Sequence, residues 1–195
     1  MTINLDLLDE ESAIEALKTV AALAEANAVE WALVGGLALA LYGSDRNTKD
    51  IDVIASQLLP LENQGLLKQG GERYSIRTKK KSVAVDWIIR NDEFKALFQE
   101  ALKEAVKFNG APILTPEWLV ILKFIAGRFK DQEDAVFLLS RKGLVDRNVI
   151  REKIIRHVGP AAWGLAKHGY QRWYHLADGR TREEERNEKE GYIDS

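Results

Sequence analysis

The chain has 195 residues, a formal net charge of −2, 46% hydrophobic and 30% charged residues, and no cysteine. This length and composition predict a soluble protein with a single compact domain or a small domain built from two units, and the near-neutral charge excludes a globally basic nucleic-acid binder. Without cysteine, disulfides and thiolate metal sites are excluded, and a cytoplasmic location is expected.

The chain begins with an acidic segment, MTINLDLLDEES, which lacks the basic and apolar regions of a signal peptide. No run of about 18 apolar residues is present, so we expect no membrane partner. Apolar residues at spacings of three and four predict an amphipathic helix over residues 9–28. We expect this helix to serve in packing.

The stretch from Trp31 to Ala55, WALVGGLALALYGSDRNTKDIDVIA, predicts a strand–helix–strand unit. Residues 32–34 form a short apolar run typical of a buried strand, and Gly35 and Gly36 end it. Residues 37–42 predict a short apolar helix, and after a polar loop residues 50–54 predict a second strand.

Two carboxylates lie on one face of this second predicted strand. Alternation puts Asp50 and Asp52 on one side and Ile51 and Val53 on the other. Adjacent carboxylates repel each other, and this arrangement is costly unless a divalent cation lies between them. The pair therefore points to a metal site.

The combination of strand, Gly-Gly, helix and Asp-x-Asp resembles the signature of the nucleotidyltransferase superfamily, whose fold is that of DNA polymerase β. Residues 46–52 read Arg-x-Thr-x-Asp-Ile-Asp, which looks most like the minimal nucleotidyltransferases of the AbiEii toxin type. The stretch is also similar to aminoglycoside nucleotidyltransferases and to the head of CCA-adding enzymes. The resemblance is specific over residues 34–53 and looser to about residue 139.

The next segment is predicted as a helix over residues 58–69, followed by strands over 72–80 and 82–90 with a lysine-rich turn at 79–81. Asp86 lies in the middle of the apolar second strand. It is either an edge-strand residue that faces solvent or a third metal-site carboxylate. In the superfamily the third acidic residue comes from a later strand beside the Asp-x-Asp strand, and Asp86 matches that position.

The rest of the chain is predicted to be mainly helical. The predicted elements are a helix over 92–108, a short extended piece over 111–114, and helices over 116–128, 129–143, 146–158 and 161–177. Minimal nucleotidyltransferases carry a Lys in the first helix of a similar pair, and Lys-Asp-x-x-Asp opens the second. Lys123, Lys130, Asp131 and Asp134 match these positions.

Residues 141–180 hold nine Lys and Arg against three Asp and Glu. This excess could attract phosphate or could be a solvated helix surface. Aromatic residues among the cations could stack on bases, although at helical spacing they more often belong to a core. Residues 181–195 form a highly charged tail.

The fold is therefore expected to be α/β, with a small mixed β-sheet of the nucleotidyltransferase type and a helical C-terminal part. We assign residues 1–114 to a catalytic domain, 115–180 to the helical part and 181–195 to the tail. The leading function is a magnesium-dependent nucleotidyltransferase that moves a nucleoside monophosphate from a nucleoside triphosphate to an acceptor hydroxyl and releases pyrophosphate.

The resemblance implies that Asp50, Asp52 and Asp86 are catalytic and hold two Mg²⁺ ions. The triphosphate is assigned to Gly35 and Gly36, whose backbone N–H groups open a helix, and to Arg46, Thr48 and Lys123. The acceptor could be tRNA, a protein or a small molecule. The protein could be a toxin with a cognate antitoxin, an aminoglycoside-like enzyme, or a non-catalytic binding module with the same fold.

Overall fold

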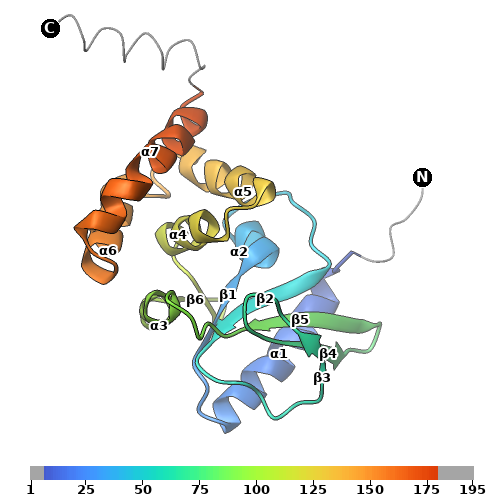
Figure 1. The fold of residues 1–195 in the computed structure, drawn as a ribbon. Coiled ribbons are helices and arrows are strands. Elements are labelled where there is room, and N and C mark those ends of the chain that lie inside the picture. The colour runs from blue at the N-terminus through green and yellow to red at the C-terminus, as the bar shows by residue number, and fades with distance from the viewer. Residues whose placement is uncertain (1–6, 180–195) are drawn as a thin grey trace, which may run out of the picture. The chain divides into compact units, whose positions relative to one another are not determined.

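The computed structural model describes residues 7–179. The described residues form two compact units that divide between Thr115 and Pro116, and the elements of both are drawn in Figure 1. The predicted charged tail, residues 181–195, lies outside the described residues, as does Arg180 of the basic segment.

The first unit contains a mixed sheet of seven strands in the order β3-β4-β5-β2-β1-β7-β6. Strand β2 is parallel to β5 and β1 to β7, whereas the other neighbours are antiparallel. The strands are β1 Trp31–Val34, β2 Asp50–Ala55, β3 Asn63–Leu66, β4 Gly71–Arg77, β5 Ser82–Ile88, β6 Val106–Phe108 and β7 Ala111–Ile113. The α/β class with a mixed sheet is confirmed.

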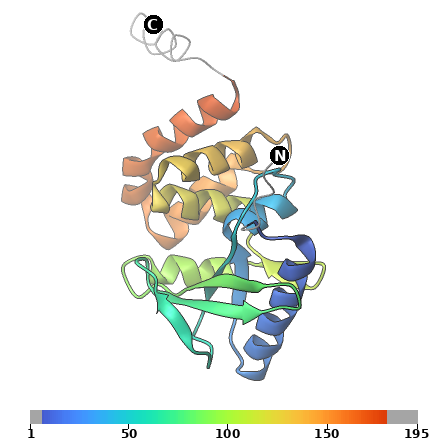
Figure 2. The same ribbon diagram turned by 90° about the vertical axis from the view of Figure 1, so that its right-hand side faces the viewer.

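Three helices accompany the sheet, namely α1 Glu10–Ala26, α2 Gly35–Leu41 and α3 Lys95–Lys103. Asp9 caps α1 by accepting the backbone N–H of Ser12 at 3.0 Å. The helix contacts β4 and β5 and runs along the sheet in Figure 2. It covers the apolar side of these strands, where alternate residues such as Tyr74 and Val85 are buried. The opposite side of the same strands carries Arg73 and Asp86.

Two predicted helices of the first unit are wrong in whole or in part. Residues 58–69 form a turn and the edge strand β3, which pairs with β4. Hydrogen bonding to β4 outweighs the weak helical pattern of this segment. Residues 92–108 are helical only over α3, and β6 follows. Asn109 and Gly110, with φ of 48° and 88°, form a β-hairpin turn between β6 and β7 instead of ending a helix.

The second unit is a helical bundle made of α4 Pro116–Ala126, α5 Phe129–Ser140, α6 Arg147–His157 and α7 Pro160–Ala177. Helices α5 and α6 pack on α7, and α4 packs on α5 and α6. Phe124 stacks on Tyr170 with ring centroids 4.0 Å apart and meets the edge of Trp173 at 5.0 Å. Tyr170 and Trp173 are buried, so these aromatic residues belong to the core.

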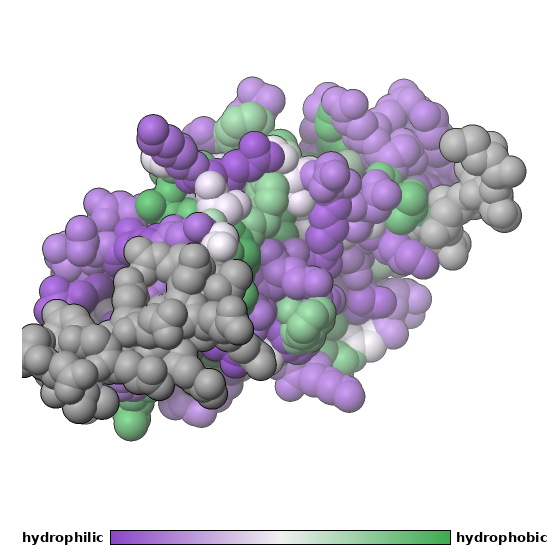
Figure 3. All heavy atoms as spheres, turned by 90° about the horizontal axis from the view of Figure 1, so that it is seen from above, coloured by the Kyte–Doolittle hydropathy of each residue, from purple (hydrophilic) through white to green (hydrophobic). Residues whose placement is uncertain are grey.

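No helix within residues 7–179 has both the length and the apolar composition that crossing a membrane requires. On the face drawn in Figure 3, hydrophilic residues predominate and hydrophobic residues occur in scattered groups between them. Isolated exposed apolar side chains, such as Leu66 and Leu165, are normal on protein surfaces.

Candidate active site

Three carboxylates share one face of the sheet. Asp50 and Asp52 lie on β2, on the face opposite the fully buried Ile51 and Val53. Strand β5 is parallel to β2 and pairs Asp86 with Asp52, so the Asp86 side chain lies on the same face. Because β5 lies between β4 and β2, Asp86 is not on an edge strand. The strand register therefore places Asp86 directly beside Asp52.

An arginine that the sequence patterns did not indicate reaches this acidic face. Arg73 on β4 is the register partner of Asp86. Its Nε donates a hydrogen bond to Asp86 Oδ1 at 2.5 Å, and its Nη2 donates to Asp86 Oδ2 at 2.9 Å. The same Nη2 donates to Asp50 Oδ2 at 3.4 Å. Arg73 is thus a bidentate partner of one carboxylate and a neighbour of a second.

The charges of the acidic face raise the pKa of Arg73. The hydrogen bond to Asp86 is the largest cause of the raised pKa. Partial burial acts in the opposite direction, and the negative charges of Asp86, Asp50 and Asp52 raise the pKa further. The guanidinium is therefore the counter-ion of all three carboxylates. Because its side chain is 44% exposed, water screens much of this attraction.

The donor chemistry of the acidic face suits a hard divalent cation, which prefers carboxylate oxygens. The arrangement is incomplete, however, since no group of three or more Asp, Glu or His side chains within residues 7–179 is placed to hold a metal ion. Both oxygens of Asp86 instead accept hydrogen bonds from Arg73. A cation could be held by Asp50 and Asp52, and at Asp86 it would meet the charge of Arg73.

Two glycines bring the backbone close to these carboxylates. Gly35 has a φ of +64°, and a Cβ there would lie 1.9 Å from Asp52 Oδ2. A Cβ on Gly36 would lie 2.8 Å from Thr48 Cβ. The Thr48 hydroxyl can in turn donate to the Asp50 carbonyl at 3.1 Å or to Asp50 Oδ1 at 3.3 Å. The predicted residues Gly35, Gly36 and Thr48 are therefore brought together with the Asp50–Asp52 pair.

The other two residues assigned to the triphosphate have different surroundings. Arg46 is half-buried in the loop before β2, and its backbone N–H donates to Ser44 Oγ at 3.2 Å. Lys123 belongs to the second unit, and its Nζ donates to Asp131 Oδ1 at 2.9 Å and to Asp134 Oδ2 at 2.6 Å. Two of the three N–H donors of Lys123 are thus used within its own unit. A phosphate-binding role for either residue stays a prediction.

Lys123, Arg128, Asp131 and Asp134 form an ion cluster between α4 and α5. Arg128 donates from Nε to Asp131 Oδ2 at 2.6 Å, and Asp131 is completely buried. Burial alone would raise the pKa of Asp131, but the hydrogen bonds from Arg128 and Lys123 outweigh it and lower the pKa. The stabilisation from this group is therefore present above its ordinary pKa and is lost as the pH falls through the lowered value.

The buried cluster predicts a stability effect. Replacing Asp134 with Asn should lower the free energy of unfolding by about 2 kcal/mol, because a buried charged donor loses one charge-assisted hydrogen bond. Urea unfolding followed by circular dichroism measures the change. Glu133→Gln removes the same charge from an exposed position of the same helix and should change stability by less than about 0.5 kcal/mol. Equal effects of the two substitutions would show that the cluster does not stabilise α4 against α5.

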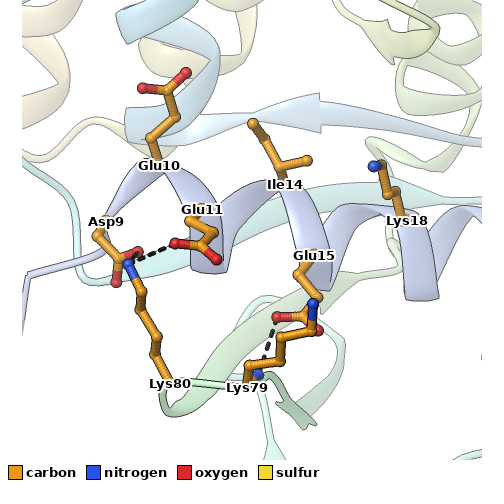
Figure 4. Close-up of a pocket in the computed structure, with 8 residues that line it drawn as sticks. All are labelled: Asp9, Glu10, Glu11, Ile14, Glu15, Lys18, Lys79 and Lys80. Atoms are coloured by element: carbon orange, nitrogen blue, oxygen red, sulfur yellow. Dashed lines mark hydrogen bonds and ion pairs between the residues drawn. The ribbon is translucent and has the colours of Figure 1, made fainter.

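A hollow of about 700 Å³ lies where α1 meets the turn between β4 and β5. Figure 4 shows its charged lining. Lys80 pairs with Glu11 at 2.6 Å, and the backbone N–H of Lys79 donates to Glu15 at 2.9 Å. Neither Asp50, Asp52 nor Asp86 lines this hollow, and we do not place the candidate active site there.

No protein-family model and no curated protein matches the chain. Among solved structures, JHP933 from Helicobacter pylori is 13% identical with a TM-score of 0.49, and the match covers 96% of this chain and 100% of that one. An antigenic nucleotidyltransferase-like protein from Paracoccidioides brasiliensis is 15% identical with a TM-score of 0.40, over 89% and 95% of the two chains.

Proposed function

We propose that the protein is a magnesium-dependent nucleotidyltransferase that transfers a nucleoside monophosphate from a nucleoside triphosphate to an acceptor hydroxyl. The observation that carries the proposal is the pairing of Asp52 with Asp86 across parallel strands, with Asp50 on the same face. The Gly-Gly and Asp-x-Asp pattern of residues 35–52 supports it, because the backbone at Gly35 meets the carboxylate of Asp52.

Each residue has a role that follows from its position. Asp50 and Asp52 would hold Mg²⁺, which when bound neutralises charge on the phosphates and on the attacking oxygen. Asp86 would complete the ligand set and accept the proton of the acceptor hydroxyl, or simply orient that hydroxyl. Gly35 and Gly36 begin α2, where no side chain caps the helix, so their N–H groups could donate to phosphate oxygens.

The acceptor would be a hydroxyl on an RNA end such as that of tRNA, on a protein side chain, or on a small molecule. The pattern of residues 46–52 favours a toxin of the AbiEii type with a cognate antitoxin. An aminoglycoside-like resistance enzyme is the alternative within the same chemistry. A neighbouring gene for a small partner protein would favour the toxin.

Transfer of an α-phosphate label tests the proposal. The purified protein is incubated with Mg²⁺ and each of the four α-labelled nucleoside triphosphates, together with total tRNA, a cell extract or an aminoglycoside. We expect label on one acceptor class and an equal amount of pyrophosphate, both lost when EDTA is added. Release of labelled nucleoside diphosphate instead of pyrophosphate would contradict nucleotidyl transfer, because it shows cleavage at a different phosphate.

A second candidate is a binding module without catalysis. The bidentate contact between Arg73 and Asp86 favours it, because this contact neutralises the third carboxylate without a metal ion. A module of this kind would bind nucleotide without Mg²⁺ and would transfer no label. Calorimetric titration with nucleotide in EDTA distinguishes the two candidates.

A further inference from the structure

Arg73 and a divalent cation require the same atoms. A metal ligand must offer an oxygen lone pair, and each oxygen of Asp86 already uses one of its two in accepting a hydrogen bond from Arg73, at 2.5 and 2.9 Å. A cation bound by Asp86 would also lie close to the guanidinium of Arg73, and the two positive charges would repel each other. Arg73 uses one lone pair on each oxygen of Asp86 and adds a positive charge beside them, and it therefore opposes binding of a cation there.

The exposure and the contacts of Arg73 allow its side chain to move away from Asp86. Its side chain is 44% exposed, whereas that of Asp86 is 11% exposed, so the arginine approaches the carboxylate from the solvent side. Its second contact, to Asp50 Oδ2, is long at 3.4 Å. Arginine keeps a long flexible chain, and its charge is well solvated once the contact breaks. Strand β4 stays paired with β5 through its backbone.

We propose that Arg73 is a positioning residue that competes with the divalent cation for Asp86. Without a cation, it holds the Asp86 carboxylate in place and offsets the repulsion among the three aspartates. A cation must bind beside its positive charge and with fewer lone pairs of Asp86 free, and Arg73 therefore weakens the affinity of the site for metal. This inference rests on the proposed function, since it concerns the metal site of the same three carboxylates.

Binding of Mn²⁺, measured by calorimetry without nucleotide, tests the competition. We expect Arg73→Gln to bind Mn²⁺ about ten-fold more tightly than the unaltered protein, the lower end of what a charge-assisted hydrogen bond is worth. Its melting temperature without metal should fall, and its rise on addition of Mn²⁺ should be larger. A purely structural role for Arg73 predicts the lower melting temperature but no gain in Mn²⁺ affinity.

Arg77→Gln is the matched control. Arg77 lies four residues further along β4, on the same face and also exposed, and its register partner is Ser82. It loses the same charge without touching Asp86, so its Mn²⁺ affinity should change less than about two-fold by general screening considerations. Arg73→Lys keeps the charge but not the bidentate contact and should bind Mn²⁺ with intermediate affinity. If Arg73→Gln does not fold, Arg73→Lys still tests the competition.

Mn²⁺ binding by Asp52→Asn and by the Arg73 variants tests the proposed function and this inference separately. If Asp52→Asn removes Mn²⁺ binding but Arg73→Gln and Arg73→Lys bind as the unaltered protein does, the competition is refuted and the metal site stands. If Asp52→Asn leaves Mn²⁺ binding unchanged, or no variant binds Mn²⁺, both are refuted. In an Asp86→Asn background, the gain from Arg73→Gln should disappear, because the two changes remove the same contact.

Discussion

Asp52→Asn is expected to reduce nucleotidyl transfer by at least about 1,000-fold, since a metal site contributes several kcal/mol to stabilising the transition state and each 1.36 kcal/mol is a factor of ten. Asparagine preserves the shape of the side chain and removes only its charge. Asp52 is half-exposed on β2, so the variant should stay folded. Label transfer and circular dichroism measure the two properties.

Glu62→Gln is the control for Asp52→Asn, because it removes one negative charge from an exposed position of the same unit. It should retain full transfer. Full activity of Asp52→Asn would refute the metal site, and with it the assignment of Asp50 and Asp86 as metal ligands.

Gly35→Ala is expected to reduce transfer by about 100-fold or more, because the new methyl group would overlap Asp52 Oδ2 and an ångström of displacement at a catalytic group costs about this much. The substitution also forces an alanine into a positive φ, which costs about 1–2 kcal/mol of stability. Transfer rates and urea unfolding together distinguish the collision from the backbone strain.

Gly110→Ala isolates the strain. Gly110 also has a positive φ, +88°, in the turn between β6 and β7, but no atom lies within 4 Å of an added Cβ. It should lose only the stability due to backbone strain, about 1–2 kcal/mol, and keep its activity. If both variants lose stability and both stay active, the contact between Gly35 and Asp52 has no role in catalysis.

The predictable features of the site are those in which local patterns determine position. The alternation of Asp50 and Asp52 with apolar residues put them on one face, and the apolar strand around Asp86 made that carboxylate conspicuous. The strand–helix–strand unit from Trp31 to Ala55 is present as β1, α2 and β2. For Asp50, Asp52 and the strand–helix–strand unit, the pattern repeats over several residues and one interpretation accounts for all of them. Asp86 allowed two interpretations, and only the position of β5 inside the sheet excludes the edge strand.

Arg73 could not be found in this way, because its position depends on how β4 pairs with β5. The pairing is set by the turn at residues 78–81, from which Arg77 meets Ser82 and Arg73 meets Asp86. The predicted strand of residues 72–80 overlapped the turn and left the register open. A one-residue shift would have moved every side chain of β4 to the other face. A turn placed at residues 78–81 instead of 79–81 would have fixed the register. In the structure, the Thr78 hydroxyl donates to the Lys81 carbonyl at 2.6 Å within this turn.

In the second unit, too, the pairing of side chains could not be predicted from local patterns. The motif residues Lys123, Asp131 and Asp134 were noticed in the sequence, and the structure joins them in a buried ion cluster. Charged residues in an apolar helical pattern indicate that a partner is required, since buried charges are paired. They do not indicate which groups pair, because that depends on how α4 and α5 pack.

Anomalous diffraction from crystals grown with Mn²⁺ and a non-hydrolysable nucleoside triphosphate tests the central claim most directly. A metal peak within coordination distance of Asp50 and Asp52, roughly 2.0–2.1 Å for the Mg²⁺ that Mn²⁺ replaces, with the phosphates beside Gly35 and Gly36, is the predicted result. The guanidinium of Arg73 should then have left Asp86. Nucleotide and metal bound away from the Asp50–Asp52 face, or nucleotide bound there with no metal peak, would contradict the account.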